Sequence, residues 1–188
     1  KILEKIKDRG KFIILEKTLF TKFNEYFCVM SNVEDLSNVF VNSWTHLLDE
    51  FKILKNRINV GTYKIEISGS NWGLACNAVH YINLFEELGK FRFINVNQEK
   101  TFIEKIYNSK RESYSDLYGC LTLISQKKLE LCLIDNPSKF TTENKERVIK
   151  IFNKDKIYFF KHNASYLEDC EKGKKYNTKF MSQVLVDE

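Results

Sequence analysis

The apolar pattern of the chain changes near residue 60, and this change limits the folds that the sequence can adopt. Before it, residues 12–15 and 38–42 form short apolar runs, which are typical of strands buried on both faces. Helical spacing precedes, separates and follows these runs, at residues 1–8, 21–30 and 47–58. The order helix, strand, helix, strand over residues 1–42 predicts part of a parallel α/β domain.

After residue 60, apolar and polar residues alternate, as they do in strands with one covered face. Residues 63–67 form the first such strand, and a helix over residues 74–88 follows, with Gly89 as its stop. Further strands are predicted at residues 91–96, 102–107, 118–124, 129–134, 147–152 and 156–161. The last four form two hairpins, so we expect an open, mostly antiparallel sheet with helices on one face.

The two patterns predict two domains, with the first over residues 1–42 and the second over residues 43–188. The fold class is α/β, with an α+β C-terminal part. The chain begins in the middle of the α/β pattern, and residues 179–188 read as the start of a helix. We therefore expect a protein fragment, or a chain with missing segments at both ends.

Composition excludes several functional classes. The net charge is +5, but lysines are interleaved with acids and form no basic run, so we expect no nucleic-acid partner. No apolar run is long enough to cross a membrane, and residues 1–11 do not resemble a signal peptide. The five cysteines include no C-x-x-C pair, which argues against a zinc knuckle and indicates reduced thiols in the cytoplasm. No metal site is predicted.

The helix predicted over residues 74–88 has two contrasting faces. One face is apolar, and the other carries small, mostly uncharged polar groups, namely Gly73, Cys76, Asn77, His80, Asn83 and Glu87. Spacings of four and three residues place Cys76, His80 and Asn83 on one stripe, which is typical of the wall of a polar pocket. His80 is either a general base, because histidine titrates near neutral pH, or a hydrogen-bonded structural residue.

Other candidate ligand contacts follow the two buried strands. Glu16, Lys17 and Thr18 come directly after the first strand, at the strand end where α/β sheets bind ligands. Asn42 and Trp44 follow the second strand, and Trp72 precedes the helix. Each tryptophan is predicted either to stack on a sugar face or to pack in the interior. We expect His162, at the end of a strand, to lie on the surface.

Two segments of the chain resemble the glucose–fructose oxidoreductase/inositol dehydrogenase (Gfo/Idh/MocA) family. Residues 10–18 read GKFIILEKT, which resembles the family segment G-K-h-V-l-x-E-K-P. Residues 69–85 read GSNWGLACNAVHYINLF, which resembles its G-G-G-x-l-x-D-x-G-x-H-x-x-D helix. The order of the two segments and the sheet pattern that follows also agree.

The resemblance implies an NAD(P)-dependent oxidoreductase acting on a sugar, a sugar nucleotide or a cyclitol. Residues 1–42 would be the end of a Rossmann-type domain, and the rest a domain for substrate binding and oligomerisation. Lys17 and His80 would be catalytic, and Glu16, Lys17 and Thr18 would contact NAD or NADP. The substrate would contact Asn42, Trp44, Trp72, Cys76, Asn77 and Asn83. The resemblance also implies a homo-oligomer through the open sheet, whose strands carry apolar faces such as Leu129, Leu131 and Leu133.

The sequence departs from the family pattern at several positions. Thr18 replaces a proline, while Cys76 and Asn83 replace the aspartates on either side of the histidine. None of the seven glycines forms the G-x-G-x-x-G loop that holds a pyrophosphate, so we expect weak NAD binding by these residues alone. Three hypotheses remain, namely a sugar dehydrogenase, a non-catalytic sugar-binding relative, and an assembly module on the same scaffold. For the first, the amide-rich stripe suggests a role in surface-glycan synthesis.

Overall fold

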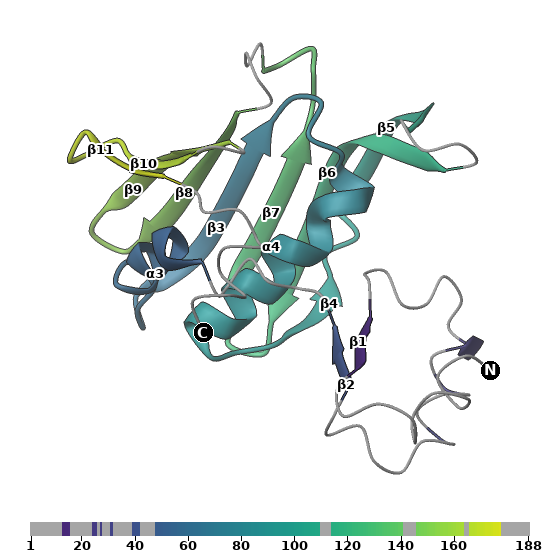
Figure 1. Cartoon of the computed structure of the whole chain (residues 1–188), viewed down its shortest axis with the longest axis horizontal. Coiled ribbons are helices and arrows are strands. Elements are labelled where there is room, and N and C mark those ends of the chain that lie inside the picture. Colours follow the sequence, from purple (N-terminus) through teal and green to yellow (C-terminus); the bar gives the residue numbers. More distant parts are fainter. Residues whose placement is uncertain are drawn as a thin grey trace. The chain divides into compact units, whose positions relative to one another are not determined.

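A computed structural model describes residues 13–15, 24, 25, 27, 31, 39–41, 48–109, 114–140, 146–163 and 166–177. The chain divides into two compact units, Lys1–Ser43 and Trp44–Glu188. In the first unit, β1 (Ile13–Leu15) and β2 (Val39–Val41) pair in parallel, with Ile14 opposite Phe40 (Figure 1). This confirms the parallel pairing of the two apolar runs. That this unit is the end of a Rossmann-type domain stays a prediction.

Within the described part of the second unit, nine strands form one sheet (Figure 1). They are β3 (Thr62–Gly69), β4 (Phe93–Val96), β5 (Phe102–Asn108), β6 (Ser115–Ser125), β7 (Glu130–Asp135), β8 (Arg147–Asn153), β9 (Ile157–His162), β10 (Tyr166–Asp169) and β11 (Lys174–Asn177). Their order is β11-β10-β9-β8-β3-β7-β6-β4, and β5 pairs with the other half of β6. Among these pairs, β3 and β7 run parallel and the others run antiparallel. The predicted fold class, an open and mostly antiparallel sheet, is confirmed.

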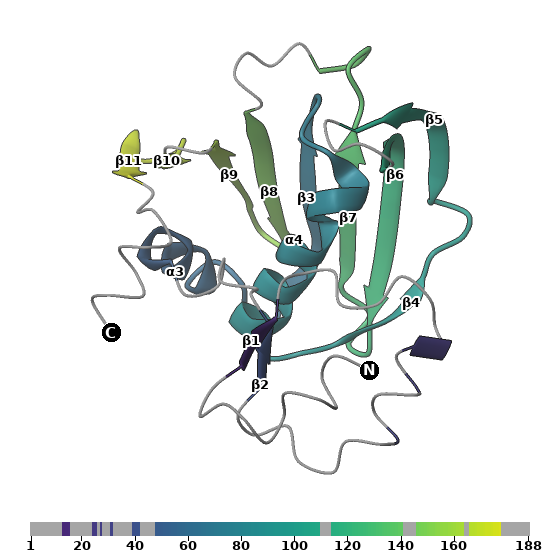
Figure 2. The same ribbon diagram turned by 45° about the vertical axis from the view of Figure 1, so that its right-hand side comes forward.

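Two helices lie on one face of this sheet, as Figures 1 and 2 show. The helix α3 (Asp49–Lys55) and the helix α4 (Leu74–Gly89) both contribute to a core beneath them. The core includes Leu129, Leu131 and Leu133, whose exposed fractions are 5%, 0% and 0%. These leucines therefore lie on the covered face, and the expectation that they form an open face for another subunit is wrong. Leucine alternation marks a buried face but does not say which element buries it.

The end of α4 differs from the prediction in its detail. The residue with left-handed backbone is Lys90, with φ of 50°, and its N–H donates to the carbonyl of Glu86. Gly89 is the last helical residue, and a Cβ atom there would lie 1.9 Å from the Phe91 ring. Glycine is thus needed at this position for the close packing of an aromatic ring.

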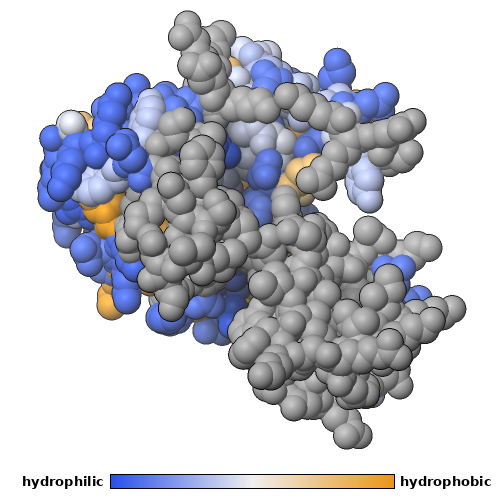
Figure 3. All heavy atoms as spheres, in the orientation of Figure 1, coloured by the Kyte–Doolittle hydropathy of each residue, from blue (hydrophilic) through white to orange (hydrophobic). Residues whose placement is uncertain are grey.

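The last two strands, β10 and the edge strand β11, were not predicted, because both are short and rich in charged residues. They form a hairpin whose turn contains Gly173, with φ of +63°. Residues 172–175, which include three lysines, lie in this turn and at the start of β11 and are exposed. On the side seen in Figure 3 most of the described surface is hydrophilic, with scattered apolar patches. Among the described residues no helix combines the length and the apolar character that a membrane crossing requires.

A buried aromatic cluster joins α3, α4 and β9. The Tyr81 hydroxyl lies 3.1 Å from Nδ1 of His162, whose ring packs edge-on against Phe51 at a centroid distance of 4.9 Å. His162 is only 9% exposed, so its predicted surface position is wrong. A strand-end histidine looks like a surface residue in sequence, but here α3 and α4 cover it. Burial, with a smaller effect of the nearby Arg147 charge, lowers the pKa of His162 to about 3.

This buried histidine predicts a pH-dependent stability. An unfolded chain has a histidine pKa of about 6.5, so below that pH the unfolded state binds a proton that the folded state does not. The free energy of unfolding should be fully present above pH 6.5 and should fall as the pH falls toward 3. Between pH 7.5 and pH 5 the loss from this residue is about 2 kcal/mol, measurable by urea denaturation. The free energy of unfolding of a His162→Gln variant should fall less than that of the wild type over the same pH range. An equal fall in both proteins would show that His162 does not cause it.

Candidate functional site

Two carboxylates from the sheet hold the N-terminus of α4. The N-cap residue of α4 is Gly73, with φ of 79°, so no side chain of the cap itself satisfies the first helical N–H groups. Asp135, at the end of β7, accepts a hydrogen bond of 2.8 Å from the Gly73 N–H. Asp116, in β6, accepts one of 2.8 Å from the Ala75 N–H. The sheet therefore supplies the caps that the helix lacks, at the end where a helix dipole favours negative charge.

Both carboxylates are buried, with Asp135 at 0% and Asp116 at 5% exposure. Burial is the main cause that raises the pKa of Asp135, and the negative charge of Asp116 adds to it. Hydrogen bonds from the backbone of Gly73, Asn71 and Trp72 oppose this rise. A buried carboxylate surrounded by backbone N–H groups is a typical anchor for a loop and a helix start.

The predicted polar stripe lies on one continuous helix, as its spacing indicated. Cys76, Asn77, His80 and Asn83 all belong to α4, and each of these residues is half-buried. The Asn77 amide Nδ2 donates to the carbonyls of Trp72 (2.6 Å) and Gly73 (3.1 Å). Its N–H donors thus bind the loop before the helix. No catalytic or substrate role of these residues is tested by this geometry.

Trp72 is placed in the interior. Trp72 is 4% exposed, and its indole N–H donates a hydrogen bond of 2.8 Å to the carbonyl of Ile134. Its ring packs edge-on against Tyr81, with centroids 5.6 Å apart. Of the two roles that the sequence left open for Trp72, this burial favours packing in the interior over stacking on a sugar, because little of the side chain is accessible.

An aromatic pair that the sequence analysis missed lies beside this loop. The rings of Tyr107 and Tyr118 stack with centroids 4.3 Å apart, and the Tyr118 hydroxyl donates to Oδ1 of Asn71 at 2.7 Å. Partial burial raises the pKa of Tyr107, and the negative charge of Asp116 raises it further. The pair depends on the register between β5 and β6, in which Tyr107 faces Asp116 and Lys105 faces Tyr118. Residue types alone gave no signal for it.

The remaining predicted contacts lie outside the described residues. These are Glu16, Lys17, Thr18, Asn42 and Trp44. The strands that precede them in sequence, β1 and β2, are parallel and end at Leu15 and Val41, so their carboxyl ends share one edge. Their roles therefore stay predictions.

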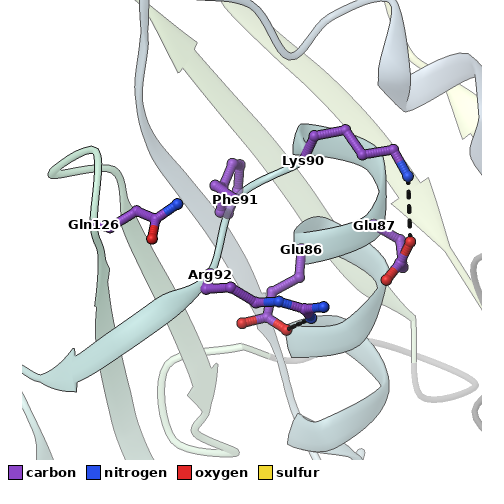
Figure 4. A pocket seen from close by; sticks show the side chains of 6 residues that line it. All are labelled: Glu86, Glu87, Lys90, Phe91, Arg92 and Gln126. Atoms are coloured by element: carbon purple, nitrogen blue, oxygen red, sulfur yellow. Dashed lines mark hydrogen bonds and ion pairs between the residues drawn. The ribbon is translucent and has the colours of Figure 1, made fainter.

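A separate hollow of about 310 Å³ lies at the other end of α4 (Figure 4). It is lined by Glu86, Glu87, Lys90, Phe91, Arg92 and Gln126. Its charges pair with each other, through Lys90 with Glu87 at 3.3 Å and Arg92 with Glu86 at 2.9 Å. Lys90 follows His80 by ten residues, which is about 15 Å along a helix, so this hollow is not the predicted site. In the described ranges no group of three or more His, Cys, Asp or Glu side chains is arranged to hold a metal ion.

Solved structures of several oxidoreductases share this fold. UDP-N-acetylglucosamine 3-dehydrogenase GnnA from Acidithiobacillus ferrooxidans matches with a TM-score of 0.62 and 8% identity, over 98% of this chain and 62% of that one. Biliverdin reductase from Synechocystis sp. PCC 6803, solved with biliverdin and NADP+, matches with a TM-score of 0.63 and 14% identity, over 99% and 63%. D-galactose-1-dehydrogenase from Rhizobium etli matches with a TM-score of 0.59 and 10% identity, over 97% and 62%.

At these identities the likeness shows the fold, which is the one that the Gfo/Idh/MocA resemblance implied. The chain spans about three fifths of the length of these structures. No protein-family model matches the sequence, and no curated protein matches it at a significant level.

The capping carboxylates predict a graded loss of stability. Asp116→Ala leaves the Ala75 N–H without its acceptor and should lower the free energy of unfolding by about 1–2 kcal/mol in urea. Asp116→Asn keeps an acceptor oxygen and should cost less. Hydrogen exchange of residues 74–77 should speed up in the alanine variant, while Asp155→Ala, in a hairpin turn, should leave it unchanged. A loss in Asp116→Asn as large as in Asp116→Ala would contradict the capping role.

Proposed function

We propose that the chain is part of an NAD(P)-dependent oxidoreductase of the Gfo/Idh/MocA type, acting on a sugar, a sugar nucleotide or a cyclitol. The observation that carries the proposal is α4, a helix of 16 residues packed on the open sheet with a neutral polar stripe around His80. The two sequence segments that resemble the family support it, as does the shared fold of the solved dehydrogenases and reductase. A role in surface-glycan synthesis is a narrower form of the same proposal, suggested by the amide-rich stripe.

In this proposal His80 takes the proton of the substrate hydroxyl, and Lys17 binds that hydroxyl and holds it in position. A bound nicotinamide would supply the redox chemistry by accepting the hydride. The sequence contains no G-x-G-x-x-G loop, so Lys17 is proposed to contact the nicotinamide, and no residue of this chain is proposed to hold the pyrophosphate.

The aromatic pair of Tyr107 and Tyr118 extends the proposed substrate surface. The stacked rings lie beside the loop that begins α4, and neither side chain is fully buried. Aromatic faces bind the apolar faces of sugar rings, while an amide such as that of Asn83 suits hydroxyl and acetamido groups. Such a surface would bind sugar in an enzyme and equally in the alternative, a non-catalytic sugar-binding relative. The alternative is favoured by Cys76 and Asn83, which stand where the family pattern has aspartates.

Cofactor binding and turnover separate these alternatives. The protein expressed from its complete gene should bind NADH or NADPH in calorimetry and should oxidise at least one of UDP-N-acetylglucosamine, D-galactose and myo-inositol. His80→Asn should lower kcat by about 10²–10⁴-fold because the general base is removed, and its urea midpoint, measured alongside, separates this loss from unfolding. Glu87→Gln, on the same helix, is the matched control and should keep full activity.

Four outcomes would each contradict a part of this proposal. Absence of nicotinamide binding removes the oxidoreductase, and an unchanged rate in His80→Asn removes His80 from the mechanism. Sugar binding without cofactor binding would instead support the non-catalytic relative. Turnover of biliverdin but of no sugar would reject the substrate class.

The face of the sheet opposite the helices is proposed to bind a second copy of the chain. Exposed apolar side chains lie there, including Ile157 at 41% and Phe159 at 43% exposure. They pair with Phe152 and Lys150 of β8, whose neighbours Ile149 and Ile151 point into the core. The central charges are paired, since Glu66 binds Lys64 at 2.9 Å and Lys150 at 3.0 Å, so a second copy would meet no unpaired charge of this cluster.

This surface predicts a concentration-dependent dimer. Phe159→Glu should shift the protein toward monomer in sedimentation velocity, because a charge would be buried against the second copy. Val60→Glu changes a residue outside this face that is fully exposed and should leave the association unchanged. A wild-type protein that stays monomeric at every concentration would reject the proposal.

A further inference from the structure

Two thiols meet on neighbouring strands of the sheet. Cys120 in β6 and Cys132 in β7 have their Sγ atoms 3.3 Å apart. The two residues are 6% and 7% exposed. Other described cysteines lie elsewhere, with Cys76 on α4 and Cys170 exposed in a turn. The close pair is therefore a distinct feature of the sheet.

The pair lies on the sheet face away from the helices. Cys132 is flanked by Leu131 and Leu133, which point into the core beneath α4, so its own side chain points to the opposite side. In the neighbouring strand β3, Cys132 is paired with Glu66, which forms ion pairs with Lys64 and Lys150. The thiols thus belong to a polar, charged part of the open face and not to the core.

This surrounding activates one of the two thiols. The hydrogen bond from the Cys132 thiol lowers the pKa of Cys120, and Thr122 and the positive charge of Lys64 act in the same direction against burial. The same hydrogen bond, together with burial, raises the pKa of Cys132. The hydroxyl oxygen of Thr122 lies 3.5 Å from Cys120 Sγ and 3.7 Å from Cys132 Sγ. One sulfur is thus favoured as a thiolate and the other as a proton donor, which is the division of roles that thiol oxidation needs.

We propose that Cys120 and Cys132 form a reversible dithiol–disulfide site that hydroperoxides oxidise. The Cys120 thiolate attacks the terminal peroxide oxygen, the O–O bond breaks, and the leaving oxygen takes up a proton as water or alcohol. Cys120 is then a sulfenic acid. The Cys132 sulfur attacks the Cys120 sulfur, and the hydroxyl leaves with the Cys132 proton as water. The two thiols lose two electrons, which the peroxide gains.

The strand register explains why the disulfide would be reversible. Cys120 is paired with Ile134, and Thr122 is paired with Cys132, so the cysteines are diagonal neighbours. Diagonal neighbours have Cα atoms about 7–8 Å apart, whereas disulfides usually join Cα atoms about 4.4–6.8 Å apart. The disulfide therefore requires the strands to move and stores strain, and strained disulfides are readily reduced. This site is independent of the proposed oxidoreductase, and its test uses neither cofactor nor sugar.

Peptide mapping tests the proposal directly. Trypsin places Cys120 in peptide 112–127 and Cys132 in peptide 129–139, and each peptide contains a single cysteine. After treatment of the dilute full chain with hydrogen peroxide and digestion without reductant, mass spectrometry should find these two peptides joined. Dithiothreitol should release them completely. Oxidation of Cys170 in the same sample, with peptides 112–127 and 129–139 found separate, would overturn the proposal.

Two variants distinguish the roles of the sulfurs. Cys132→Ser should leave Cys120 as a sulfenic acid that dimedone traps, and Cys120→Ser should leave Cys132 unmodified at the same peroxide dose. Cys170→Ser is the control and should form the linked peptides at the wild-type rate. Dimedone labelling of Cys132 in place of Cys120 would reverse the assigned roles and reject the mechanism. The wild-type peptide map decides the proposal even if a variant does not fold.

Discussion

The hydrogen bonds from Gly73 and Ala75 to two buried carboxylates fix the position of α4 on the sheet. A helix that begins at a glycine has no side chain to satisfy its first N–H groups, and here Asp135 and Asp116 reach them from β7 and β6. The strands β6 and β7 are neighbours in the sheet. On its other side β7 pairs in parallel with β3, the strand that leads into the loop before α4. The stripe around His80 is therefore positioned by the sheet, and its orientation depends on strands far away in sequence.

Local patterns predicted the elements better than their surroundings. The alternation after residue 60 located the seven strands from β3 to β9, and helical periodicity located α4 within one residue. The short strands β10 and β11 were missed, because each has only four residues and half of these are charged. The face of Leu131 and the burial of His162 were also predicted wrongly. Both depend on where α3 and α4 pack, and a single strand's sequence carries no record of which element covers it.

The same limit applies to the candidate site. Cys76, His80 and Asn83 share one side of α4 because helical spacing alone determines that arrangement. Asp116 and the tyrosine pair enter the neighbourhood through the register of β5, β6 and β7, which includes an irregularity between Ile103 and Lys105. A shift of one residue in that register would turn these side chains to the other face. Residue types and spacings therefore predicted the helix part of the site and missed the sheet part.

The placement of the carboxylates bears on how His80 would work. The Gfo/Idh/MocA pattern that the sequence resembles has acids beside the histidine, and this chain has Cys76 and Asn83 there instead. One oxygen of Asp135 and one of Asp116 accept hydrogen bonds from the Gly73 and Ala75 N–H groups at the start of the same helix. The replacements at positions 76 and 83 remove the two acids of the family pattern from the helix itself. A carboxylate that acts on His80 must therefore come from another element of the fold, whose position depends on strand register and not on helical spacing.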